Sequence, residues 1–220
     1  MYRRFAVGLI AKAATSDTFS PKFAGQLPPF RHKQRHKYCF MSYLLAISGH
    51  PNKFSRPGFL LQALARHLYP YQVELRTAYA VDLKAEASEA QARLNDLIGL
   101  IRNARGILLL APVPKDDWSG SLKVLLDRLP DRVFQYKPVL VVGSGGFVGE
   151  TEDLERSLAP NLERLAAHLS LAPVHVGLKN WVFVGDQPPS LTFGTEARLA
   201  DAVRRFHGQI AEAVRLSEAA

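Results

Sequence analysis

The chain has 220 residues, of which 47% are hydrophobic, so it can bury the core of one domain of ordinary size. The formal net charge is +8, but residues 1–40 alone contribute +7, with eight Lys or Arg and a single acid, Asp17. The rest of the chain is therefore nearly neutral, and its charge gives no reason to expect a nucleic-acid partner. The single cysteine, Cys39, excludes an internal disulfide, and no apolar run approaches the roughly 20 residues that span a bilayer.

Residues 1–40 predict a basic, disordered extension that is separate from the domain. They carry no sustained hydrophobic period and end in a basic run at 31–37. Organelle transit peptides have this composition, but so does upstream sequence that a start codon chosen too early would include. We favour the second interpretation, because Met41 stands where a compact domain would begin. The expectation is a domain over 41–220 in a reducing, cytoplasmic compartment.

From Ser42 onward, apolar runs alternate with amphipathic segments. The apolar runs predict strands at 43–48, 72–81, 107–111, 138–142 and 174–184. Helical spacing predicts helices at 57–68, 85–103, from Ser119 to about Leu129, at 151–170 and at 195–213, with Val124 and Leu169 among their apolar positions. This alternation indicates a parallel sheet with right-handed crossovers, either flavodoxin-like or Rossmann. No G-x-G-x-x-G follows the first strand, which weighs against the Rossmann alternative.

The stretch Gly106–Asp127 combines a strand, a loop and a helix start. Residues 107–111 are an unbroken apolar run, typical of a central parallel strand that is covered on both faces. Residues 112–118 contain two prolines and a charged triplet, which predicts an exposed loop. Ser119 is a suitable N-cap for the helix that follows. In open α/β sheets, ligands bind at corners of this kind, and we interpret this one as a flavin site.

Three strand ends, the first, third and fourth, lead into unusual loops that converge if the strand order is 2-1-3-4-5. The first loop, 50–56, enters a helix N-terminus that favours a phosphate, with Ser55 and Arg56 as added donors; the alternative is a plain turn in which Ser55 is only a cap. In the second loop, Trp118 offers a flat surface for a ring or is a packing residue. The third loop, 143–146, has three glycines that allow close approach of a planar ligand or form a tight turn.

No catalytic triad, metal cluster or paired-carboxylate motif is apparent. Asp116 and Asp117 are adjacent in sequence and are interpreted as solvated. His168, His175 and His207 fall within predicted helices or a strand, where packing or surface roles are expected. If the protein is an enzyme, a cofactor therefore carries the chemistry, and no catalytic or metal-binding side chain is assigned.

The segment 111–127, APVPKDDWSGSLKVLLD, is similar to a family signature, T/A-P-V-Y-K-x-x-Y-S-G-x-L-K-x-L-L-D. That signature belongs to NAD(P)H-dependent FMN reductases, in particular to the type that supplies reduced flavin to alkanesulfonate monooxygenases. The stretch GHPNKFSR at 49–56, the phrase LPDR at 129–132 and the glycines at 145–146 resemble the family in the corresponding places. The resemblance covers the chain from Ser42 to its C-terminus.

The resemblance implies a flavodoxin-like three-layer sandwich with a five-stranded parallel sheet in the order 2-1-3-4-5. It implies FMN on the three loops, hydride transfer from NADPH or NADH to the flavin, a homodimer or homotetramer, and a flavin-dependent monooxygenase as a partner. From charge and hydropathy, no nucleic-acid or membrane partner is expected. The cofactor-binding residues expected on these loops are His50, Asn52, Ser55, Arg56, Pro112, Val113, Pro114, Lys115, Trp118, Ser119, Gly120, Gly143, Ser144, Gly145 and Gly146.

The chain departs from the family pattern at a few positions that bear on FMN affinity, flavin release and oligomeric state. His50 and Asn52 replace a serine and an arginine, Pro57 and Gly58 replace serines, Pro114 replaces a tyrosine, and Arg156 stands where the sulfonate-type reductases have a tyrosine. Two other functions compete with the FMN reductase. One is a quinone or azo-dye reductase that holds FMN throughout its cycle, and the other is a non-enzymatic electron carrier or scaffold. Carriers of this fold are typically acidic, which the nearly neutral domain is not.

Overall fold

The computed structural model describes residues 43–50, 55–80, 87–112, 120–145, 150–169 and 171–218. Its centre is a parallel sheet of five strands in the order β2-β1-β3-β4-β5. The strands are β1 (Tyr43–Ser48), β2 (Glu74–Tyr79), β3 (Gly106–Pro112), β4 (Val139–Ser144) and β5 (Val174–Val176). The order confirms the predicted flavodoxin-like arrangement. The predicted boundary between 1–40 and 41–220 lies outside the described residues and stays a prediction.

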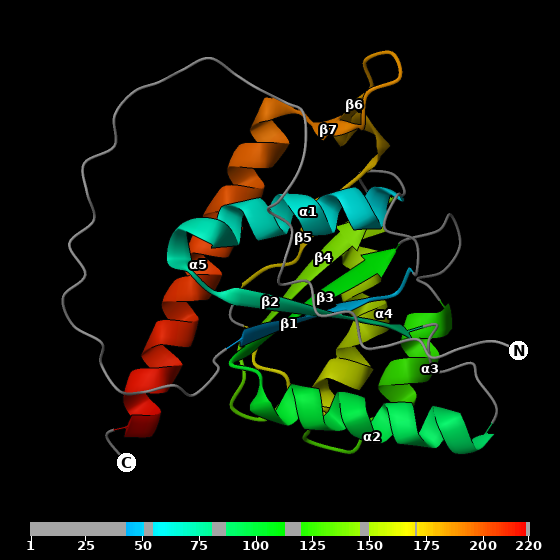
Figure 1. Cartoon of the computed structure of the whole chain (residues 1–220), viewed down its shortest axis with the longest axis vertical. Coiled ribbons are helices and arrows are strands. Elements are labelled where there is room, and N and C mark those ends of the chain that lie inside the picture. Colours follow the sequence, from blue (N-terminus) through cyan, green and yellow to red (C-terminus); the bar gives the residue numbers. More distant parts are fainter. Residues whose placement is uncertain are drawn as a thin grey trace, which may run out of the picture. The chain divides into compact units, whose positions relative to one another are not determined.

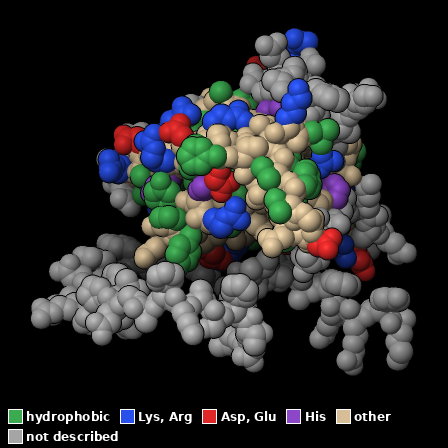
Figure 2. Space-filling view, turned by 90° about the horizontal axis from the view of Figure 1, so that it is seen from above, with side chains coloured by type: hydrophobic (Ala, Val, Ile, Leu, Met, Phe, Trp, Pro, Cys, Tyr) green, Lys and Arg blue, Asp and Glu red, His purple; other side chains and the backbone are tan. Residues whose placement is uncertain are grey.

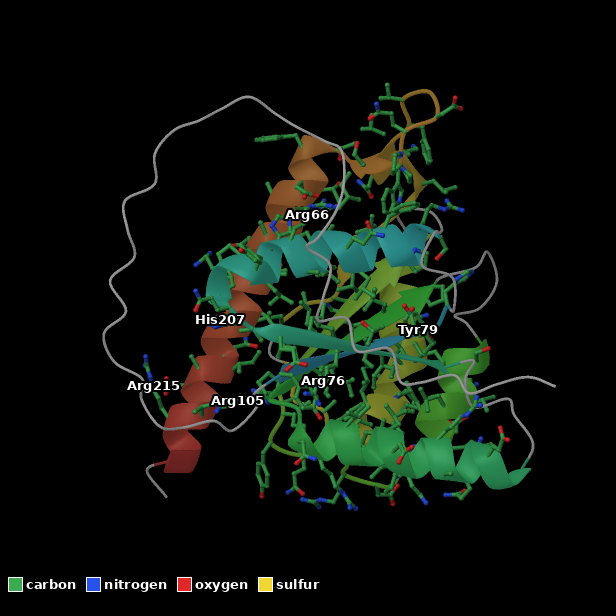
Figure 3. The ribbon with its side chains drawn as sticks, viewed as in Figure 1. Arg66, Arg76, Tyr79, Arg105, His207 and Arg215 are labelled. Atoms are coloured by element: carbon green, nitrogen blue, oxygen red, sulfur yellow. The ribbon has the colours of Figure 1, made fainter. Side chains whose placement is uncertain are left out.

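Helices cover both faces of the sheet, which gives three layers (Figure 1). One face carries α1 (Arg56–Leu68) and α5 (Phe193–Glu218), and the other carries α2 (Ala87–Asn103), α3 (Gly120–Arg128) and α4 (Glu150–Arg164). A short 3-10 turn, η1 (Tyr69–Tyr71), follows α1, and the ring of Tyr71 stacks on His207 of α5 at 4.2 Å (Figure 3). None of the described helices is both long and apolar enough to cross a membrane.

The strands are apolar without interruption because both of their faces are buried. In β1, Leu45 and Ile47 pack in the core beneath α2, α3 and α4, whereas Leu44 and Ala46 pack in the core beneath α1 and α5. Successive side chains of a strand point to opposite faces, so one apolar run serves both cores. This is the physical reason that β1, β3 and β4 could be predicted from sequence.

The edge strand β2 is only half buried, and a charged side chain covers part of it. The guanidinium of Arg76 lies over the Tyr43 ring at 3.9 Å from its centroid and pairs with Glu74 at 2.8 Å (Figure 3). The hydroxyl of Tyr43 donates to the Leu100 carbonyl at 2.7 Å, and burial of the ring raises the Tyr43 pKa. The strand begins later than predicted, because Gln72 adopts a left-handed φ of 54° after the 3-10 turn.

The prediction of one long strand over 174–184 is wrong. β5 ends at Val176, and a 3-10 turn, η3 (Leu178–Asn180), follows, in which Asn180 Oδ1 accepts from Gly177 N at 2.9 Å. The chain then forms a separate antiparallel pair, β6 (Trp181–Val182) with β7 (Ser190–Leu191). The prediction failed because it took Phe183 and Val184 as buried strand residues, whereas both are exposed.

The predicted helix over 151–170 is also too long. α4 ends at Arg164, because Ala166 adopts a left-handed φ of 56° and the chain turns. Ala167 N donates to Leu162 O, and Ala166 N donates to Glu163 O, both at 2.9 Å. These two bonds form a Schellman motif, which terminates a helix even where the sequence remains helix-favouring.

Two further expectations about helical faces are corrected. Leu169 lies beyond α4 and is 43% exposed, and Val124 on α3 is 58% exposed, since the buried face of α3 consists of Leu122, Leu125 and Leu126. The last helix, α5, begins two residues before the predicted range of 195–213 and ends five residues after it. Thr195, at its predicted start, is buried in the first turn, where its hydroxyl lies 2.9 Å from that of Thr192.

Candidate functional site

The carboxyl ends of β1, β3 and β4 lie side by side. Ser48 pairs with Leu110, and Pro112 pairs with Ser144, so the three strands end close together. Helices α1 and α3 lie on opposite faces of the sheet, but both begin at this end of it (Figure 1). We call these three strand ends, with the described residues that follow them, the carboxyl edge. The strand order thus confirms that the three unusual loops leave the sheet next to one another.

A close backbone contact fixes the separation between the carboxyl ends of β1 and β3. Gly49 N donates to Leu110 O at 3.0 Å. A Cβ atom on Gly49 would lie 2.7 Å from Pro112 Cδ and 3.2 Å from Leu122 Cβ, so only glycine fits here. The end of β1 can therefore lie against the start of the central loop.

Two serines make hydrogen bonds at the described ends of the first loop. The buried Ser48 hydroxyl donates to His50 O at 2.9 Å and accepts from His50 N at 3.2 Å. Ser55 is the N-cap of α1, and its Oγ accepts from Gly58 N at 3.3 Å. The structure therefore shows the capping role of Ser55, and a contact of Ser55 with a phosphate stays a prediction. Arg56 is exposed in the first turn of α1.

The end of β4 combines a buried hydroxyl with an unusual glycine. Ser144 is 4% exposed, and its Oγ has no hydrogen-bond partner among the described residues. Gly145 adopts a φ of 107°, which side-chain-bearing residues rarely adopt. Its N–H donates to Val176 O at 3.0 Å, and its carbonyl lies 2.6 Å from Nε2 of the buried His175. The loop after β4 is thus held by β5.

Part of the predicted site lies outside the described residues. These positions are Asn52, Val113, Pro114, Lys115, Trp118, Ser119 and Gly146, together with Asp116 and Asp117. At the two ends of the central loop, Pro112 is half-buried at the end of β3, and Gly120 is exposed at the start of α3. Within the described part of the chain, a Cβ on Gly120 would meet no atom within 4 Å.

The described residues fit a planar ligand that carries a phosphate. The first turn of α1 offers an anion the positive end of the helix dipole and the exposed Arg56, whereas Pro57 has no N–H and the Gly58 N–H already donates to Ser55 Oγ. The buried Ser144 hydroxyl keeps its hydrogen-bonding capacity within the described part of the chain. A buried polar atom of this kind requires an explanation, and a polar ring edge of a ligand would supply a partner. FMN has both a phosphate and such a ring.

Fold and site together define a flavodoxin-like α/β protein of the flavin-binding kind. The similarity of a solved NADH:FMN oxidoreductase supports this fold, with a TM-score of 0.60 at 22% identity over 75% of this chain and 88% of that one. The model of the NADPH-dependent FMN reductase family matches residues 43–180. The chain belongs to this family.

Two characterised relatives have similar lengths and the same activity as each other. An FMN reductase (NADPH) of Pseudomonas putida is 31% identical over 76% of this chain and 88% of its own length. An FMN reductase (NADPH) of Escherichia coli K12 is 30% identical over 74% of this chain and 87% of its own length. Family membership confirms the predicted enzyme class, an oxidoreductase, and the predicted FMN and NADPH.

Two residues at this edge were not predicted as site residues. The Ser48 hydroxyl binds the backbone of His50, and His175 contacts Gly145 at the end of β4. A packing or surface role was predicted for His175, and the structure places it in β5, 8% exposed. The available signal was a polar side chain between two valines, but its contact with Gly145 depends on strand register, which sequence periodicity does not contain.

Proposed function

We propose that this chain reduces FMN with NADPH at the carboxyl edge, with the flavin phosphate at the N-terminus of α1. The flavin ring would lie between the central loop and the end of β4. The observation that carries this proposal is the meeting of three loop-bearing strand ends in a chain of the FMN reductase family. Each of these ends offers something different: an anion site, an exposed glycine and a buried hydroxyl.

The protein's own part in this reaction is to hold two flat rings in contact and in line. Bound FMN supplies the chemistry, since its ring accepts a hydride from the nicotinamide. Arg56 would pair with the phosphate, because Asn52 cannot supply a charge. Ser144 and Gly145 would border the ring at the end of β4. The central loop with Trp118 would bound the ring from the side of β3.

The test is spectroscopic and kinetic. The purified protein should change the absorption spectrum of added FMN, and it should consume NADPH in air when FMN is present, because reduced flavin reoxidises. Trp118→Ala should lower this rate, whereas Asp116→Ala should change it little. NADH is measured in parallel, since nothing in the described residues selects a 2′-phosphate.

The other outcomes point to the competing functions. Flavin that stays bound through turnover with a quinone or azo dye would indicate a reductase of those acceptors. Binding of FMN without oxidation of either nucleotide would indicate an electron carrier. Failure to bind FMN would indicate a scaffold.

We further propose that the chain forms a homodimer or homotetramer, acts in the cytoplasm, and can supply reduced flavin to a monooxygenase. In support of assembly, large apolar side chains are exposed on the segment after β5 and at the start of α5, namely Leu178, Phe183, Val184 and Phe193. Figure 2 looks onto the face that carries α1 and the β6–β7 pair, where hydrophobic side chains lie among charged ones. Light scattering should report a mass of two or four chains.

A further inference from the structure

Gly145, the described residue that follows β4, makes two hydrogen bonds to β5. The N–H of Gly145 donates to Val176 O at 3.0 Å, which continues the backbone pairing of β4 with β5. The carbonyl of Gly145 lies 2.6 Å from Nε2 of His175, which is the second bond and the only one of the two that a side chain makes. The N–H and the carbonyl of Gly145 are therefore both hydrogen-bonded to residues of β5.

The chemistry of the second bond fixes the histidine tautomer. A carbonyl oxygen can only accept, so Nε2 of His175 must carry the hydrogen and donate it. The ring is 8% exposed, which shields this bond from water. Breaking it would leave the Gly145 carbonyl without its buried donor, and such a carbonyl would turn toward another partner.

The direction of this carbonyl matters because of where Gly145 lies. Its φ of 107° is accessible to glycine and rare for other residues, so the local backbone is unusual and needs to be held. Gly145 directly follows Ser144 at the carboxyl edge, whose buried hydroxyl has no hydrogen-bond partner within the described residues. Backbone that borders a planar ligand must be fixed to within a few tenths of an ångström to contribute to binding.

We propose that His175 is a positioning residue for the flavin ring, acting through the Gly145 carbonyl on the loop after β4. This inference rests on the proposed function, which places the ring at this loop. His175 contacts the loop and not the flavin. It should therefore affect binding of the flavin ring and not binding of the phosphate, which is expected at α1.

The test compares FMN with riboflavin, which has the same ring and lacks the phosphate. His175→Leu removes the donor, and His175→Gln keeps an N–H at a similar reach. His168→Leu is the matched control, since His168 is an exposed histidine near the amino end of β4, where its backbone carbonyl accepts from Val139 N at 3.1 Å. Each protein is titrated with both flavins by fluorescence quenching, and its melting temperature is recorded.

The expected result is about a tenfold loss of affinity for both flavins in His175→Leu, from the loss of one buried hydrogen bond. His175→Gln should recover most of this loss, and His168→Leu should show none. A change that only loosened the fold would lower the melting temperature of both His175 variants without a difference between Leu and Gln in flavin binding.

A double-mutant cycle tests the route through Gly145. Gly145→Ala places a side chain on a residue with an unfavourable φ, and this variant alone should bind both flavins more weakly. If His175 acts through this residue, the losses of His175→Leu and Gly145→Ala should not add in the double variant. Additive losses, or unchanged flavin affinity in His175→Leu, would overturn the inference while wild-type binding still supports the proposed function. No flavin binding by the wild type would overturn both.

Discussion

The two ends of the parallel sheet use different residue types for different purposes. At the carboxyl edge, serine hydroxyls bind nearby backbone groups, and the Ser144 hydroxyl has no hydrogen-bond partner among the residues that the structure describes. At the opposite end, which we call the amino edge (residues 102–105 and 129–138, where the chain enters β3 and β4), long cationic side chains bind backbone carbonyls. Near the amino edge, cationic side chains therefore stabilise the fold. At the carboxyl edge, we expect the small polar residues to leave space for a ligand.

Arg164 shows the pattern of the amino edge most fully. Its guanidinium donates to Leu126 O at 2.6 Å, to Leu129 O at 2.9 Å and to Asp131 Oδ1 at 2.7 Å. The two carbonyls lie at the C-terminal end of α3, where Leu126 O also accepts from Leu129 N at 3.2 Å. One side chain of α4 therefore completes the end of α3 and fixes the turn that leads to β4.

The largest effect is expected from Arg164→Met. It keeps much of the apolar stem but removes donors from two part-buried carbonyls, so the free energy of unfolding should fall by about 3 kcal/mol. Urea denaturation measures this loss. Arg204→Met is the control, because Arg204 pairs with Asp201 on the exposed side of α5 and should change stability little. If the two variants unfold alike, the amino edge is not held by Arg164.

A smaller effect, on binding rather than stability, is expected from Arg56→Ala at the carboxyl edge. Loss of a charge-assisted hydrogen bond to the phosphate should weaken FMN binding by about one to two decades. Riboflavin should bind as before, and the melting temperature should stay the same, since Arg56 is exposed. Equal losses for FMN and riboflavin would show that Arg56 orders the loop instead. Asn52→Arg should tighten FMN binding if the loop has the family's shape.

Lys137 should give the next effect, again on stability. Its ammonium donates to Arg102 O at 2.9 Å and to Ala104 O at 2.7 Å, and so completes the end of α2. Lys137→Met should cost about 1 kcal/mol of unfolding free energy at neutral pH. Burial lowers the pKa of this ammonium below its ordinary value of 10.5.

The sign of the pH dependence follows from that lowered pKa. Between the folded pKa and 10.5, the unfolded chain binds the proton of Lys137 more tightly than the folded chain does. The contribution of this group to stability therefore rises with pH in that alkaline window. The gap in unfolding free energy between wild type and Lys137→Met should widen there, and a gap that narrows would contradict the assigned burial effect.

The smallest effect, and a favourable one, is expected from Ala166→Gly. Ala166 has a φ of 56° in the Schellman motif that ends α4, where glycine carries no steric penalty. The substitution should raise stability by about 0.5–1 kcal/mol, as measured by thermal unfolding. A loss of stability would mean that the methyl group of Ala166 contributes packing that outweighs its strain.

The fold was predictable where one physical cause dominated. The apolar runs of β1, β3 and β4 are buried on both faces, and their positions follow directly from the sequence. Residues 174–184 also contain several valines, but β5 ends at Val176 and the chain turns at Leu178–Asn180. Hydrophobicity alone does not distinguish a buried strand from exposed apolar residues such as Phe183 and Val184. Likewise, the end of α4 depends on one left-handed residue within a helix-favouring stretch.

The candidate site divides in the same way. The roles of local residues could be read from sequence, as with the N-cap Ser55 before α1. The contact of His175 with Gly145 joins residues 30 positions apart. It depends on the register that sets Gly143 opposite His175, and this register is settled only when α4 has packed and β5 has paired.

The alternation of side chains along β1 has a consequence for which substitutions the sequence of this protein can accept during evolution. Leu44 and Leu45 are neighbours in sequence, but they belong to separate cores on opposite faces of the sheet. A loss of volume at Leu45 can be compensated only by a larger residue in the layer of α2, α3 and α4, and one at Leu44 only by the layer of α1 and α5. The family should therefore show two sets of compensating substitutions, each confined to its own layer, with the shared strands passing between them.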